Sequence, residues 1–410
     1  MIRPLIEHHI EDAAFLWLLR SVACRAPHYR LDELAKLDRR LESQFEALRM
    51  DPELSLRLCW KADATEDAGK VFLVTVLAME HEKKEDLQRA LEVGATSPDL
   101  SCGLVSAFGW LPYERVGAEI KRLLESEAAQ VRRIGIAASA IHRRQQSPAL
   151  LEALDADDPW LRARALRAAG EHGFIDSHIK LRSNLRSKAP EVRFWAAWSN
   201  TLLNGHKDAC NYLQQIAEAG GPLGERASEI AIRRLSTKDA KLWLRRLVKD
   251  LEQTRIAVIA AGAFADPEAI PFLLDQMKVP ELARVAGEAF SLITGANIAY
   301  EDLEAERPEG FESGPTENPD DENVAMDPDE NLPWPDPDLV KKWWNARQGG
   351  FSKGTRYLLG QPITTESLRS ALKNGYQRQR AAAAIELAIL KPGRPLFEVR
   401  APGWRQQAML

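Results

Sequence analysis

The stretch DDPWLRARALRAAG, residues 157–170, has the pattern of a short turn followed by an Ala-rich helix that ends at a glycine. This pattern recurs along the chain about every 31 residues. The apolar residues that begin equivalent segments are Leu100, Val131, Leu161, Val192 and Leu223. In all but the first copy a small residue follows four positions later, so that the helix can approach its neighbour closely. The fixed period predicts an all-α fold, an α-solenoid of stacked helical hairpins in which each copy is a second helix.

The segments between these copies have the apolar periodicity expected of the first helix of each hairpin. They lie at residues 114–126, 147–154, 174–185, 207–219 and 238–250, and two less regular hairpins follow with second helices near 254–264 and 280–294. Helices are also expected at residues 4–24, 31–49, 65–80 and 83–93. Because this N-terminal part matches the repeat poorly, we interpret it as a helical cap on the solenoid or as a separate bundle.

The repeated segment resembles the second helix of the HEAT-repeat family. Its fullest copy spans residues 158–170, and residues 190–197 form a partial copy. The resemblance extends over residues 98–295 and again over 364–391. It implies a scaffold that presents surfaces to partner proteins, since most such solenoids bind and few catalyse.

The composition is that of an ordinary water-soluble protein, with 45% hydrophobic and 28% charged residues and a net charge of -5. This charge gives no argument for binding to nucleic acid or to a membrane surface. The four cysteines, Cys24, Cys59, Cys102 and Cys210, are widely spaced and form no CxxC motif. No apolar run approaches the length of a membrane span, and the N-terminal charges do not fit a signal peptide. We therefore expect a cytoplasmic protein.

Charge is distributed unevenly along the chain. Residues 131–260 carry 22 Lys and Arg against 14 Asp and Glu, whereas residues 301–340 carry fifteen acidic residues and one basic residue. The acidic segment either docks on the basic face of the solenoid, with Trp334, Trp343 and Trp344 anchoring its end, or is a solvated linker. The predicted regions are a helical cap (1–95), the solenoid (96–299), the acidic Pro-rich connection (300–338) and a C-terminal helical hairpin with its tail (339–410). Asp338 is expected to cap the helix that begins the last region, residues 351–360 are expected to be loop, and the tail to Leu410 is expected to be extended.

The C-terminal third contains motifs that resemble a family of bacterial HEAT-like proteins encoded beside components of type VI secretion. The motifs are ITG at 293–295, AMDPDENLPW at 325–334, WW at 343–344, RYLLG at 356–360 and RAAAA at 380–384. The resemblance implies an accessory or adaptor role in that system.

An arginine ladder is the sharpest candidate for a binding site. Arg132, Arg162, Arg193 and Arg255 occupy equivalent repeat positions, with Gly224 interrupting the series. Equivalent positions of a solenoid line up along one edge, so the ladder can form a basic stripe that docks an acidic partner. Alternatively, each arginine pairs with a turn carboxylate such as Asp157 or Asp158, which guanidinium geometry also suits.

A neighbouring stripe combines arginine with tryptophan, the residues most enriched in binding hot spots. Its members are Arg164, Trp195 and Arg226, followed three residues later by Arg167, Trp198 and Glu229. The stripe either lines a partner-binding inner surface or fills gaps between hairpins, because a large aromatic ring gains much from burial.

Signals for catalysis and metal binding are weak. The aspartates of residues 327–331 lack the glycine of a calcium loop, and the His-Glu dipeptides at 81–82 and 171–172 do not make the set of four needed for a di-iron site. Catalytic motifs and cofactor fingerprints are absent. The sequence thus predicts a non-enzymatic protein-interaction scaffold or adaptor without a cofactor. The alternative is a nucleic-acid-binding protein or a HEAT-fold enzyme similar to DNA glycosylases, with Arg164, Trp195, Trp198 and Arg226 lining its channel.

Overall fold

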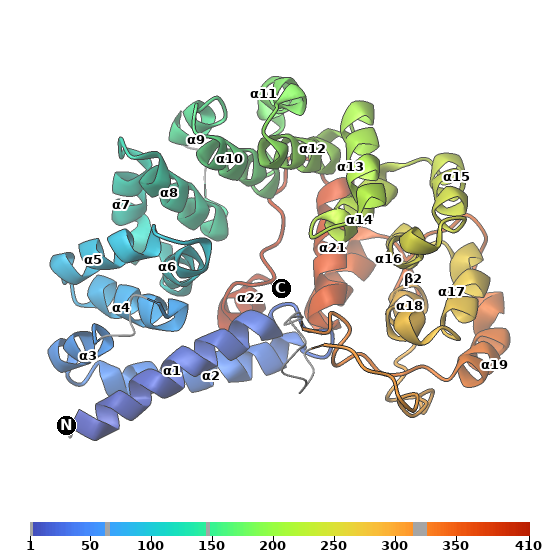
Figure 1. Cartoon of the computed structure of the whole chain (residues 1–410), viewed down its shortest axis with the longest axis horizontal. Helices are drawn as coiled ribbons and strands as arrows, with labels where there is room; N and C mark the ends of the chain where they lie inside the picture. Colours follow the sequence, from blue (N-terminus) through green and yellow to red (C-terminus); the bar gives the residue numbers. More distant parts are fainter. Residues whose placement is uncertain (1–2, 62–65, 145–147, 315–325) are drawn as a thin grey trace. The chain divides into compact units, whose positions relative to one another are not determined.

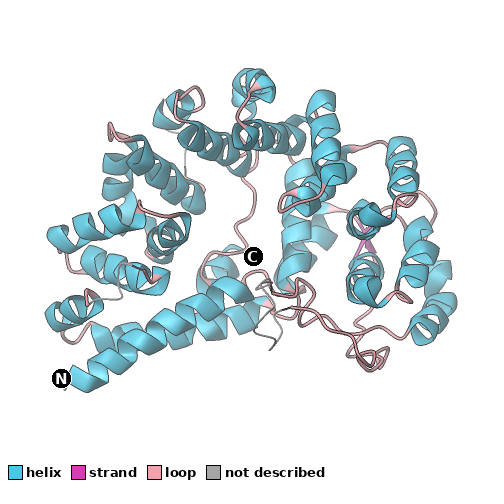
Figure 2. Cartoon of the chain, viewed as in Figure 1, coloured by secondary structure: helices cyan, strands magenta, loops and turns pink. Residues whose placement is uncertain are grey.

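Figure 1 presents the computed structural model, which describes residues 3–61, 66–144, 148–314 and 326–410. Nearly all regular structure in these residues is helical, and the sheet found there is a two-stranded hairpin (Figure 2). The predicted all-α fold is confirmed. Contacts group the chain into two compact units, residues 1–204 with 391–410 and residues 205–390. The four predicted regions follow composition and repeat pattern, whereas these units follow proximity in space.

The first unit contains the N-terminal helices, the clearest repeats and the C-terminal tail. Its helices are α1 (Arg3–Ala23), α2 (Leu31–Leu48), α3 (Pro52–Cys59), α4 (Ala68–Glu80), α5 (Lys84–Gly94), α6 (Pro98–Trp110), α7 (Tyr113–Leu124), α8 (Ala129–His142), α9 (Pro148–Ala153), α10 (Pro159–Glu171), α11 (His178–Ser183), α12 (Pro190–Asn204) and α22 (Gly403–Met409). Successive second helices pack on one another, α6 on α8, α8 on α10 and α10 on α12. Helix α3, which the sequence analysis did not assign, begins at an Asp51 cap that accepts a hydrogen bond from the Leu54 amide.

Helix α10 shows how the repeat motif works. The Asp158 side chain caps the helix by accepting from the Leu161 amide at 2.7 Å, and Pro159 occupies the first turn, where no amide donor is needed. Ala165 is fully buried. At Gly170 a Cβ atom would lie only 2.5 Å from the Ser199 hydroxyl oxygen on α12. Small residues therefore set the close approach of α10 to α12.

The C-terminal tail packs along α2, α6, α8 and α10 of the first unit (Figure 1). The Leu396 amide donates to the Glu171 carbonyl at 2.9 Å, and the Gly403 amide donates to the Asp38 carboxylate at 2.5 Å. The tail was expected to be extended throughout, but its last residues form α22. This helix begins after Pro402, whose carbonyl accepts from the Arg405 and Gln406 amides.

The second unit continues the alternation of first and second helices. Its elements are α13 (Lys207–Ala219), α14 (Gly224–Arg234), α15 (Thr237–Leu247), α16 (Thr254–Phe264), α17 (Ile270–Gln276), α18 (Pro280–Thr294), α19 (Pro337–Arg347), β1 (Tyr357–Leu358), β2 (Gln361–Pro362), α20 (Thr365–Asn374) and α21 (Gln377–Leu390). Short 3₁₀ turns lie at residues 251–253, 267–269 and 348–350 of this unit and at residues 175–177 and 184–186 of the first unit. Helices α14, α16 and α18 pack in succession.

Two local expectations in this unit are corrected. The cap of α19 is Asp336, not Asp338, because Pro337 fits the first helical position and leaves Asp338 inside the helix. Residues 351–360 were expected to be loop, but β1 lies within them and pairs with β2 in antiparallel register, Tyr357 opposite Pro362. The helices of the described residues include none that is long and apolar enough to cross a membrane.

Candidate protein-binding site

The ladder arginines of the first unit lie near the N-terminal ends of successive second helices. Arg132 is on α8, Arg162 on α10 and Arg193 on α12, and all three are half-buried. The Nε atoms of Arg132 and Arg162 are buried without a hydrogen-bond partner. The repeat thus places these arginines on helices that pack directly on one another.

No carboxylate of the described residues lies within ion-pair distance of Arg132 or Arg162. In particular, Asp158 is engaged as the cap of its own helix. The alternative in which turn aspartates neutralise the ladder therefore does not describe these two residues.

The stripe arginines, in contrast, are engaged by their own chain. Arg164 and Arg167 both pair with Glu171 on the same helix, at 3.0 and 2.8 Å. Burial raises the pKa of Glu171, but the three guanidinium groups of Arg164, Arg167 and Arg143 outweigh it and hold that pKa well below its usual range. Burial lowers the pKa of Arg164 to about 10. These groups form one ionic cluster around the buried Glu171 carboxylate.

The C-terminal tail completes this cluster. Arg143 lies 3.8 Å from Glu171 and 2.9 Å from Glu398 of the tail, and Glu398 also pairs with Arg400 at 2.9 Å. Burial alone would raise the pKa of Glu398, but Arg400 and Arg143 lower it to about 2. We call Arg143, Arg164, Arg167, Glu171, Glu398 and Arg400 the tail cluster. The i, i+4 spacing of Arg167 and Glu171 could have been noticed in the sequence, whereas nothing in it pairs Arg143 with Glu398.

The two tryptophans of the stripe pack against each other on α12. Their ring centroids are 5.6 Å apart, and the Arg167 guanidinium lies over the Trp195 ring at 4.6 Å. Trp198 is only 6% exposed, so this ring fills space between helices. Trp195 is half-buried.

In the second unit the ladder position is occupied by Arg255 on α16, and the stripe position by Arg226, which is exposed on α14. Arg255 binds Glu225 at 2.9 Å and both carboxylate oxygens of Asp329 at 2.7 and 2.8 Å. Burial opposes the charge of Arg255, but its bonds to Asp329 and Glu225 raise its pKa. The structure thus brings a ladder arginine together with the acidic segment.

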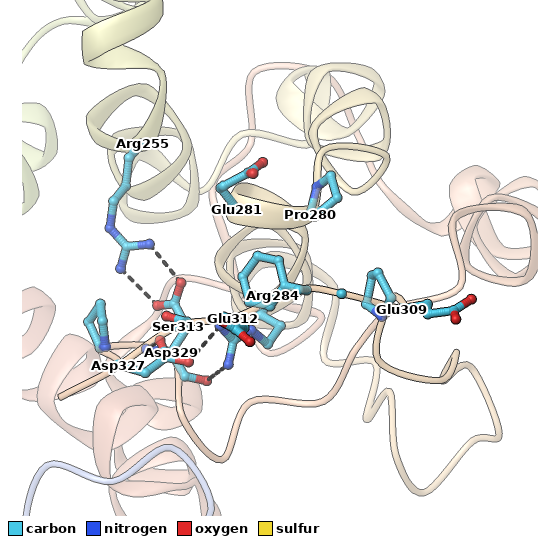
Figure 3. Close-up of a pocket in the computed structure, with 13 residues that line it drawn as sticks. Arg255, Pro280, Glu281, Arg284, Glu309, Glu312, Ser313, Asp327 and Asp329 are labelled. Carbon is cyan, nitrogen blue, oxygen red and sulfur yellow. Dashed lines mark hydrogen bonds and ion pairs between the residues drawn. The ribbon is translucent and has the colours of Figure 1, made fainter. Parts of the chain in front are cut away.

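Figure 3 shows the pocket at this contact, which has a volume of about 640 Å³. Arg284 of α18 lies beside Arg255 and contacts Asp327 at 2.7 Å, and its guanidinium also lies 4.7 Å from the Trp334 ring. Arg284 was not among the site residues predicted from the sequence, although it follows Arg255 by nearly one repeat. Residues 315–325, which belong to the predicted docking segment, lie outside the described residues.

Asp327 and Asp329, which were considered as calcium ligands, instead pair with Arg284 and Arg255. Among the described residues, no group of three or more His, Cys, Asp or Glu side chains could hold a metal ion. Of the two His-Glu dipeptides, Glu171 belongs to the tail cluster and His172 is buried beside it. Cys24, Cys59 and Cys210 are buried, whereas Cys102 is exposed.

The half-buried His142 and the buried His172 predict how stability depends on pH. Burial lowers the pKa of His142 and of His172 to about 4, against an unfolded value of 6.5. Because the folded state favours the neutral form of both histidines, their contribution to stability is complete above pH 6.5. This contribution is lost as the pH falls towards 4. We expect the thermal midpoint to fall between pH 6.5 and 5, before protonation of the unfolded-state carboxylates contributes strongly.

Scanning calorimetry at pH 6.5, 5.8 and 5 measures this fall. The double variant His142→Gln, His172→Gln should flatten it, whereas His8→Gln, at an exposed position, should leave it unchanged. An equally steep fall in the double variant would contradict the assignment.

Comparison with known proteins bears on the repeats alone. The search of curated proteins and the search of solved structures each found no match. Residues 147–233 match the family model described as HEAT repeats. HEAT repeats commonly serve as protein-interaction scaffolds, and each is one helical hairpin that buries its core against its neighbours. The chain is therefore HEAT-repeat-like over residues 147–233.

Proposed function

We propose that this chain is a non-enzymatic protein-interaction scaffold or adaptor whose binding face includes the ladder arginines of α8 and α10. The observation that carries the proposal is the absence of any carboxylate partner for Arg132 and Arg162 among the described residues. Arg164, Arg167 and Arg255 are neutralised within the chain. Arg132 and Arg162 therefore remain available to an acidic partner. The tail cluster supports the helices that present them.

Several features favour a protein partner over a nucleic acid. The net charge of -5 disfavours a polyanion, whose binding relies on many cationic contacts to phosphates. A base-binding channel would need Arg164 and Trp198 accessible, but the half-buried Arg164 is paired with Glu171 in the tail cluster and Trp198 is buried between helices. Retention on heparin that falls steeply with salt would favour the nucleic-acid alternative.

The motifs of the C-terminal third support a more specific role. Their resemblance to bacterial HEAT-like proteins encoded beside type VI secretion components suggests that the partner is an effector or another component of such a system. In that role the chain is cytoplasmic and holds its partner without chemical change. Co-purification of a secretion component from cells that express the whole gene cluster tests this part of the proposal.

The binding face is tested by affinity capture with the tagged full chain. We expect the double variant Arg132→Glu, Arg162→Glu to recover its specific partner at least tenfold less, because two repulsive carboxylates replace two attractive guanidinium groups. Quantitative mass spectrometry of the captured proteins measures the loss.

A matched control reverses the same amount of charge elsewhere in the first unit. Arg39 and Arg40 are exposed on α2, away from the ladder helices. The variant Arg39→Glu, Arg40→Glu should recover the partner as the unmodified chain does. If both double variants recovered the partner equally, Arg132 and Arg162 would not belong to the binding face.

A further inference from the structure

We infer that Arg132 and Arg162 bind a short acidic segment of a partner protein in which two aspartates stand two residues apart. This inference rests on the proposed function and specifies the chemistry of the partner. The basis is a contact within the same chain, where Arg255 and Arg284 of the second unit hold Asp329 and Asp327 (Figure 3).

The contact in the second unit is a complete recognition site for such a segment. Arg255 donates to both oxygens of the Asp329 carboxylate at 2.7 and 2.8 Å, the bidentate geometry that makes arginine selective for carboxylates. Arg284 pairs with Asp327 at 2.7 Å and donates to the backbone carbonyl of Asp329 at 3.0 Å. One arginine on each of two packed helices thus binds one aspartate of the segment.

Hydrogen bonds within residues 327–330 restrict the conformation of the bound segment. The Asp327 carboxylate accepts from the Asp329 amide at 2.9 Å, and the Asp327 carbonyl accepts from the Glu330 amide at 3.2 Å. Pro328, between the two aspartates, restricts the backbone further. An Asp-Pro-Asp turn is therefore preorganised to present two carboxylates to two neighbouring helices, which lowers the ordering cost of binding.

The first unit also carries one arginine on each of two packed second helices. Arg132 and Arg162 are 30 residues apart, and Arg255 and Arg284 are 29 residues apart. Each pair lies near the N-terminal ends of two successive second helices that pack together, α8 with α10 and α16 with α18. Helix N-termini carry partial positive charge, which adds to the attraction for a carboxylate. In the first unit, however, no described carboxylate fills the site.

The chain itself supplies a probe for this inference. A fluorescein-labelled peptide of residues 326–332, Met-Asp-Pro-Asp-Glu-Asn-Leu, contains the turn that the second unit binds. Fluorescence anisotropy with the full-length protein measures its affinity. We expect saturable binding that weakens at least tenfold in Arg132→Gln, Arg162→Gln, and at least tenfold when asparagine replaces both aspartates at positions 327 and 329 of the peptide.

Matched variants distinguish the contribution of Arg132 and Arg162 to peptide binding from a general effect of positive charge. Arg39→Gln, Arg40→Gln removes the same two charges from α2 and should bind the peptide as the unmodified protein does. Arg132→Lys, Arg162→Lys keeps the charge but loses the two-pronged geometry, so it should bind more weakly than the unmodified protein. Thermal midpoints of all variants are recorded beside the titrations, and the lysine variant provides the test if the glutamine variant does not fold.

Three results would overturn the inference: unchanged peptide affinity in the Arg132 and Arg162 variants, equal affinity for the asparagine peptide, or arginine-dependent binding of a single-stranded oligonucleotide without binding of the peptide. Failure of the peptide alone leaves the scaffold proposal standing if partner capture still depends on Arg132 and Arg162. If partner capture does not depend on Arg132 and Arg162 although the peptide still binds, the proposed function is contradicted instead.

Discussion

Replacing Glu171 with glutamine is expected to lower the free energy of unfolding of the first unit by about 3–5 kcal/mol, the range for removing one partner from a buried ionic group. Glu171 is 3% exposed and lies within 3.8 Å of Arg143, Arg164 and Arg167. Without its negative charge, these guanidinium groups repel one another in a buried site. Native-state hydrogen exchange of the most protected amides of α10 and α12 measures the change.

The control for this prediction is Glu152→Gln on α9. Glu152 is exposed, so the same chemical change should alter the unfolding free energy by less than about 0.5 kcal/mol. A loss below about 1 kcal/mol in Glu171→Gln would mean that the cluster is not a significant source of stability. Arg164→Glu would place two carboxylates together in the cluster and is therefore unsuitable as a test of partner binding.

Asp38→Ala is expected to have a comparable effect, about 3–5 kcal/mol, and to release the C-terminal tail as well. Asp38 is fully buried on α2, where it accepts from Arg20 and from the Gly403 amide. Its removal leaves the Arg20 guanidinium without its carboxylate and leaves the start of α22 without an acceptor. Hydrogen exchange should therefore accelerate across residues 396–409 more than in α10.

Asp32→Ala provides the matched control on the same helix. Asp32 is exposed, and its ion pair with Lys36 at 3.5 Å is of the surface kind that contributes little. We expect less than about 1 kcal/mol and unchanged exchange in the tail. Protection of the tail in Asp38→Ala equal to that of the unmodified protein would show that other contacts, such as those of Arg405 to the carbonyls of residues 109–111, suffice to hold it.

Helix positions could be read from the sequence because they depend on local periodicity. Residues 254–264 and 280–294 were expected as second helices, and α16 and α18 have these bounds. Errors occurred where a local signal was ambiguous. Two aspartates flank Pro337, and only the backbone geometry shows which of them caps α19.

The candidate site was less predictable because repeat spacing does not reveal ionic partners. Arg162 and Arg164 are two residues apart on the same helix, yet only Arg164 finds a carboxylate. The difference depends on which way each side chain points and on what packs against it. The Arg143–Glu398 contact joins residues 255 positions apart, a separation that leaves no pattern in a single sequence.

The sequence by itself determined the all-α architecture, the repeat period and the alignment of arginines at equivalent positions, because apolar spacing and small residues act locally and recur. Only the tertiary structure decided which of those arginines are neutralised. Burial makes an unpaired charge costly, so chain segments far away in the sequence, the Glu398 tail and the Asp329 turn, fold back to supply carboxylates to Arg143 and Arg255. Arg132 and Arg162 receive none from the described chain, and this contrast supports the binding face that we propose.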